Sequence, residues 1–97
     1  MRETFIKIES FIRNYCFKKE NLIILDDVEN YSDQKIEFVL TLGKLMISIT
    51  VLANLTYDLL VVEFESEVVV RNKTKNFNNI KELFNELEMD FEEIIDF

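Results

Sequence analysis

The sequence predicts an α+β domain of two layers, a four- to five-stranded antiparallel meander with an N-terminal and a C-terminal helix packed on one face. Three observations predict this fold. The first and last segments carry apolar residues at helical spacing, the segments between them alternate apolar with polar residues, and these strand-like segments are close enough in sequence to form hairpins. The element order is therefore αβ4α or αβ5α, in a single domain of residues 1–97.

The first helix is expected over about residues 2 to 18. Lys18 and Lys19 suit its C-terminal end, because positive charge there is favourable to the helix dipole. Its apolar residues recur on one side of the helix: Phe5, Ile8, Ile12, Tyr15 and Cys16.

The first half of the sheet is expected from three segments. A short strand is predicted at residues 22–25, where four apolar residues follow each other, and the polar stretch DDVENYSDQ after it is interpreted as a loop. Residues 35–42 and 45–53 then alternate clearly, with the even positions of the first and the odd positions of the second facing the core. Gly43 and Lys44 between them fit a two-residue hairpin turn with glycine at its first position.

A second hairpin is expected from residues 57–64 and 68–73, which are rich in branched side chains and flank the short connection EFESEV. We assign one set of alternating positions to the core face of this hairpin: Leu60, Val62, Phe64, Val68 and Val70.

The last helix is expected to begin after Asn79, which is followed three residues later by Glu82 as in a capping box. Its apolar stripe consists of Ile80, Leu83, Phe84, Leu87, Phe91, Ile94 and Ile95. From all these segments we expect the core to contain Phe5, Ile8, Ile12, Phe38, Leu40, Ile47, Ile49, Val62, Phe64, Leu83, Phe84, Leu87 and Phe91.

The residue types speak against catalysis. The chain has no histidine, which excludes a serine triad and any zinc site that uses histidine, and its single glycine excludes a glycine-rich phosphate loop. Cys16, on the apolar stripe of the first helix, is interpreted as a core residue. A further group of acids lacks the glycine and the distal glutamate of a calcium loop and is interpreted as a solvated turn: Asp26, Asp27, Glu29 and Asp33. We expect no enzyme activity, no metal and no cofactor.

Charge is distributed unevenly along the chain. The first 81 residues hold 12 acids and 11 bases, whereas the last 16 hold seven acids and no base, for a net charge of −8 overall. This balance disfavours nucleic acid and anionic membranes as partners and favours a basic protein. The alternating Arg71, Lys73 and Lys75 are interpreted as protection on the outer face of an edge strand. One unpaired cysteine and the absence of a long apolar run favour a cytoplasmic protein.

The acids of the last helix are the candidate partner-binding residues, because helical spacing places them on its outer faces without a base four residues away. They repel each other and oppose the helix dipole, so they serve either solubility or a basic partner. If they serve solubility alone, the open sheet face around Glu37, Thr41, Ser48 and Thr50 becomes the candidate. The seven acids are Glu82, Glu86, Glu88, Asp90, Glu92, Glu93 and Asp96.

In size, charge, the order αββββα and the acidic run ELEMDFEEIID, the chain resembles the small acidic immunity proteins of bacterial toxin–immunity systems. The resemblance implies a monomer or homodimer that binds and blocks a basic toxin, such as a nuclease. Two other classes stay open. A secretion or assembly chaperone would use an exposed apolar patch, and a phage-encoded inhibitor would imitate nucleic acid with its carboxylates.

Overall fold

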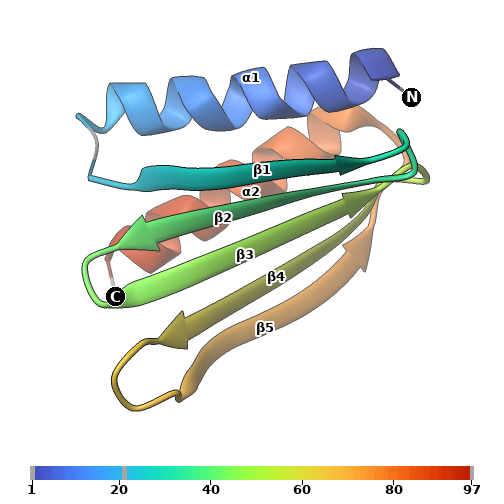
Figure 1. The fold of residues 1–97 in the computed structure, drawn as a ribbon. Coiled ribbons are helices and arrows are strands. Elements are labelled where there is room, and N and C mark those ends of the chain that lie inside the picture. Colours follow the sequence, from blue (N-terminus) through green and yellow to red (C-terminus); the bar gives the residue numbers. More distant parts are fainter. Residues whose placement is uncertain (1, 21, 97) are drawn as a thin grey trace.

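The computed structural model describes residues 2–20 and 22–96, and it confirms the α+β fold with five strands (Figure 1). The sheet is an antiparallel meander in the order β1-β2-β3-β4-β5, so each strand pairs with its neighbour in sequence. Among the described residues, no helix is both long and apolar enough to cross a membrane. The elements are α1 (Arg2–Lys18), β1 (Ile24–Tyr31), β2 (Lys35–Leu42), β3 (Leu45–Leu52), β4 (Thr56–Glu63), β5 (Val69–Asn76) and α2 (Ile80–Ile95).

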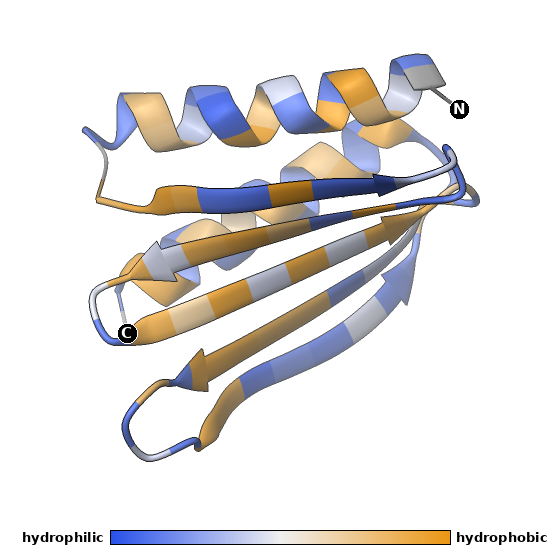
Figure 2. Cartoon of the chain, in the orientation of Figure 1, coloured by the Kyte–Doolittle hydropathy of each residue, from blue (hydrophilic) through white to orange (hydrophobic). Residues whose placement is uncertain are grey.

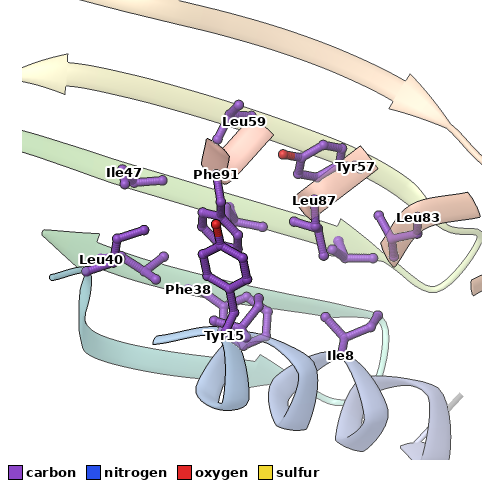
Figure 3. Packing of buried hydrophobic residues seen from close by; sticks show 14 of the residues in the cluster. Ile8, Tyr15, Phe38, Leu40, Ile47, Tyr57, Leu59, Leu83, Leu87 and Phe91 are labelled. Atoms are coloured by element: carbon purple, nitrogen blue, oxygen red, sulfur yellow. The ribbon is translucent and has the colours of Figure 1, made fainter. Parts of the chain in front are cut away.

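Both helices cover the same face of the sheet and contact each other along one side. Phe11 of α1 stacks on Phe84 of α2 at 4.4 Å between ring centroids, and Tyr15 stacks on Phe91 at 4.7 Å. Figure 3 shows the second pair above the apolar side chains of the sheet, with Phe38 beneath it. In Figure 1, α2 lies behind the sheet, and neither of the two described helices lies in front of it. The sheet therefore has one face in the core and one open face.

Most of the expected core is confirmed, since ten of its thirteen residues are buried. The other three are less buried than predicted: Phe84 and Val62 are half-buried, and Phe64 is 48% exposed. The turn at Gly43 is also confirmed: Leu42 pairs with Leu45, and Gly43 has a φ of +57°, a conformation that glycine adopts without strain.

The prediction of a short first strand followed by a loop was wrong. β1 extends to Tyr31 and includes most of the stretch that was interpreted as a loop. A β-bulge at Asp26 explains the error, because Leu25 pairs with Leu40 and Val28 pairs with Phe38. The two core-facing residues of β1 are therefore three positions apart, which hides the two-residue period of a strand.

The prediction for the core face of β4 was also wrong. Tyr57, Leu59 and Val61 are buried, whereas Leu60 and Val62 point to the open face. The run LLVV is apolar on both faces, so it fits either set of alternating positions equally well. Val68, another expected core residue of this hairpin, is exposed, while Val70 is half-buried against the core.

Candidate functional site

Asp90 lies in the protein interior, although its spacing in α2 placed it among the outward-facing acids. Its side chain is 2% exposed, and among the described residues no other charged residue is buried. Tyr57 donates a hydrogen bond to Asp90 Oδ2 at 2.8 Å, and Arg71 Nη2 and Lys73 Nζ each donate to Oδ1 at 2.9 Å. Two cations and one hydroxyl thus satisfy the carboxylate, as a buried charge requires.

The bases of β5 face the helices, which corrects their assignment to the outer face of an edge strand. Arg71 pairs across the ladder with Val61 and Lys73 with Leu59, and both of these partners are buried on the helix side of the sheet. Alternation then places Lys75 on the same side. Two more acids of α2 receive these bases: Glu93 lies 2.6 Å from Arg71, and Glu86 bonds to Lys73 and lies 3.4 Å from Lys75.

These contacts shift the ionisation of the paired groups. The hydrogen bond from Lys73, together with its positive charge, lowers the pKa of the Glu86 carboxyl. Burial opposes the charged form of Lys73, but the bonds to Glu86 and Asp90 outweigh burial and raise its pKa. Burial, followed by the charge of Asp90, raises the pKa of the Tyr57 phenol. The phenol therefore stays protonated and can donate its hydrogen bond to Asp90. The carboxyl of Glu86 is thus kept ionised, Lys73 is kept charged and Tyr57 is kept protonated, as their hydrogen bonds require.

A fourth acid of α2 connects the two helices. Tyr15 of α1 donates a hydrogen bond to Glu92 Oε2 at 2.5 Å, and Lys19 Nζ lies 3.3 Å from the same oxygen. The hydrogen bond from Tyr15, with that from Lys19, lowers the pKa of Glu92. Four of the seven candidate acids therefore have partners within the protein, and no ion pair involving Glu82, Glu88 or Asp96 occurs in the part of the chain that the structure describes.

The open face of the sheet carries a second group of acids. Asp27 and Glu29 on β1 and Glu37 on β2 lie on this face, because Val28 and Phe38, next to them in sequence, point into the core. Asp58 of β4 and Asp26 at the bulge also belong to it, since the hydroxyls of Thr74 and Thr41 on this face bond to them. The open-face acids, as we call this set, are Asp26, Asp27, Glu29, Glu37 and Asp58.

Few positive charges compensate the open-face acids. The five strands contain four bases, and three of them lie on the helix side against α2. The fourth, Lys35, lies 3.5 Å from Glu37 and 4.6 Å from the ring of Tyr31. The charge of Glu37, followed by smaller effects that include the charges of Glu29 and Asp27, raises the pKa of the Tyr31 phenol. The direction of this shift agrees with the placement of these carboxylates near Tyr31 on one region of the sheet.

Apolar side chains lie between the open-face acids. Val39, Met46, Leu60 and Val62 occupy neighbouring positions on β2, β3 and β4, and each is half-buried. Figure 2 shows that the two edge strands are largely hydrophilic, whereas the strands between them are more hydrophobic, with hydropathy alternating along β3. The open face therefore combines an apolar centre with acids on β1, β2 and β4.

Neither a metal-binding cluster nor an exposed cysteine occurs among the described residues. No group of three or more acids, cysteines or histidines among them is arranged to hold a metal ion. Asp26, Asp27 and Glu29 belong to strand β1, and Asp33 accepts a hydrogen bond from the amide of Asn30 at the following turn. Cys16 is buried, and burial raises the pKa of its thiol, which favours the unreactive protonated form.

Comparison with protein-family models, with curated proteins and with solved structures found no match.

Sequence reasoning missed two features of this arrangement. The acids Glu86, Asp90 and Glu93 recur at helical spacing, and the bases of β5 recur at strand spacing, so the complementary stripes were visible in the sequence. The loop interpretation of β1 hid three of the open-face acids, Asp26, Asp27 and Glu29, whereas Glu37 had been placed on the open sheet face. Asp58 was a usable signal for β4, because it shares alternation with Leu60 and Val62 and so marks that side as the open one.

Proposed function

We propose that this chain is a non-catalytic binding protein that neutralises a basic protein partner, as immunity proteins do, and that the partner binds on the open face of the sheet. One observation carries the proposal: five of the six acids in the described strands lie on this face, while three of the four strand bases lie on the other. Most acids of the strands thus lie on the open face, which neither helix covers, and most bases lie on the face that the helices cover. A field of this kind steers a basic partner towards the face.

The acidic face of α2, which the sequence favours as the binding surface, is a weaker candidate than the open face of the sheet. Glu86, Asp90 and Glu93 neutralise the bases of β5, so their negative charge is accounted for within the fold. Glu82, Glu88 and Asp96 are exposed and stay available as a competing surface. A cytoplasmic location, which the single buried thiol of Cys16 supports, suits a protein that blocks an internal or incoming toxin.

The proposal is tested with two variants that each remove three negative charges. The first carries Asp27→Asn, Glu29→Gln and Asp58→Asn on the open face, and the control carries Glu82→Gln, Glu88→Gln and Asp96→Asn on α2. Tagged proteins capture partners from a lysate of the source cells at low and at physiological salt. We expect the open-face variant to lose capture and salt dependence, whereas the control retains both.

The captured partner is then produced in cells with and without the chain. Growth arrest that the wild type relieves, and the open-face variant does not, supports neutralisation. Loss of capture in the α2 variant alone would move the binding surface to α2. Equal loss in both variants would mean that net charge alone causes the capture, and it would contradict the proposal.

A chaperone function is the second candidate, because three apolar residues are exposed where β4 and β5 meet: Phe64, Val68 and Val69. An apolar contact would survive high salt. Capture that persists at high salt and is abolished by Phe64→Ser would favour the chaperone.

A further inference from the structure

The free edge of β1 lacks a strand partner. β1 is an end of the sheet and pairs with β2, so among the described strands none satisfies the N–H and C=O groups on its other side. The strand is eight residues long and exposed at most positions, and it contains neither proline nor lysine, two residues that commonly protect edges. The outer edge of β5, at the other end of the sheet, also lacks a strand partner, but β5 differs from β1 in containing two lysines.

α1 presents apolar side chains towards this edge. Arg13 and Phe17 line an open hollow of about 490 Å³ together with Ile23, just before β1, and with Ile24 and Leu25 at its start. Ile6 precedes Phe17 by eleven positions, which is close to three full helical turns, so the two side chains lie on the same side of α1. Phe17 is 81% exposed and Ile6 is 56% exposed. In Figure 1, α1 runs along the β1 end of the sheet.

The other side of the same edge is acidic. Asp27 and Glu29 lie on the open face of β1, on the far side of the sheet from α1. A strand added beside β1 would therefore place one set of its side chains near Ile6 and Phe17 and the alternate set near Asp27 and Glu29. Apolar residues suit the first environment and bases suit the second. A second copy pairing β1 with β1 would instead bring these acids against each other, which disfavours a homodimer through this edge.

We propose that β1 accepts an extended segment of the basic partner as a sixth strand, with apolar residues towards α1 and lysine or arginine on the open face. The inference rests on the proposed function and names how the partner binds. Main-chain hydrogen bonds would supply affinity, while the alternating environments would select the sequence, as in other cases of strand addition.

The test uses synthetic peptides of about eight residues, the length of β1. One peptide alternates lysine with valine, a second alternates glutamate with valine, and a third is the lysine peptide with N-methyl groups on every second amide. The methyl groups remove hydrogen-bond donors from one edge and leave the charge unchanged. We expect the lysine peptide to bind, and the other two to bind at least about tenfold more weakly.

Hydrogen exchange and substitution locate the binding edge. Bound lysine peptide should slow exchange of β1 amides and leave β5 amides unchanged. Phe17→Ser should weaken the peptide, whereas Met89→Ser, which alters an equally exposed apolar residue on α2, should not. Both side chains are exposed, so neither variant is expected to lose stability.

Four results would overturn strand addition. Equal binding of the methylated peptide would mean that charge alone holds it, and the open-face proposal would stand without a sixth strand. Protection of β5, or no binding at about 1 mM peptide, would place the partner elsewhere. A dimer in sedimentation that Phe17→Ser disrupts would make a second copy the occupant. Failure of the proposed function is separate, because it appears as intact partner capture by the open-face variant.

Discussion

Lys73 of β5 donates hydrogen bonds to both carboxylate oxygens of Asp90 in α2, at 2.9 and 3.0 Å. The pair belongs to a series, since Lys75 contacts Glu86 and Arg71 contacts Glu93. Alternate residues of a strand are about 6.6 Å apart, and residues four apart in a helix are about 6 Å apart, so the two stripes stay in register. Three acids of the last helix, Glu86, Asp90 and Glu93, thus serve the fold, because they hold α2 against an edge strand whose inner side is basic.

Asp90→Asn is expected to destabilise the protein. Removing one member of a buried ion pair costs about 3 to 5 kcal/mol, and we expect about 3 kcal/mol here because Arg71 and Lys73 retain Glu93 and Glu86. Urea unfolding measures the loss. Glu88→Gln is the control, since this exposed acid repels its neighbours, and its loss should stabilise by about 0.2 to 0.5 kcal/mol. Equal midpoints for Asp90→Asn and wild type would contradict the contact.

Leu59→Ala and Leu60→Ala form a matched test of the inner face of β4. Leu59 is buried and Leu60 is half-buried on the open face. The first substitution leaves a cavity and should cost about 2 to 5 kcal/mol, as should Leu87→Ala in α2, whereas the second should cost about 1 kcal/mol. A larger loss of stability for Leu60→Ala than for Leu59→Ala would contradict this assignment. It would mean that Leu60, as the sequence pattern predicts, is on the buried face of β4.

Stability is expected to fall in acid through Glu86 and Glu92. The pKa of each carboxyl is lowered in the folded protein from its ordinary value of 4.5. Their contribution is therefore complete above the unfolded-state pKa and is lost as pH falls through the folded-state pKa, below about pH 4.5. Urea midpoints between about pH 7 and about pH 3 follow this loss. Glu86→Gln should flatten the slope, and an unchanged slope would exclude Glu86 as its source.

Glu92→Gln is expected to loosen the contact between the two helices. The substitution removes the charge that Tyr15 and Lys19 bond to, so amide exchange in the last turns of α1 should become faster. Glu93→Gln is the comparison, because its partner Arg71 lies on β5 and not on α1. Exchange in α1 that responds equally to both variants would mean that the effect is a general loss of stability.

Calcium and magnesium are expected to leave the melting temperature unchanged, as is a chelator. Asp26, Asp27 and Glu29 lie along a strand with one of them bonded to Thr41, which is a poor geometry for an ion that needs about six to eight oxygen ligands. Thermal unfolding with each ion tests this. A rise of several degrees would return these acids to consideration as a metal site.

Periodicity in the sequence determined the two helices, the hairpin at Gly43 and the order of the meander, because each depends on contacts between residues close in the chain. The bounds of β2 and the cap at Asn79 follow from the same local rules. The bulge in β1 and the inner face of β4 did not follow, since pairing with a neighbouring strand, and not the local pattern, sets which side of a strand is buried.

The same limit applies to the candidate site. The excess of acids in the last helix is evident from the sequence, but their partners are not. Spacing along the chain predicts charge pairs only within one helix or strand. Tertiary packing decided that Asp90 is buried between Tyr57, Arg71 and Lys73, and that the uncompensated acids lie on the open face. Charge composition is a property of the chain, whereas neutralisation depends on distances between residues that only folding brings together.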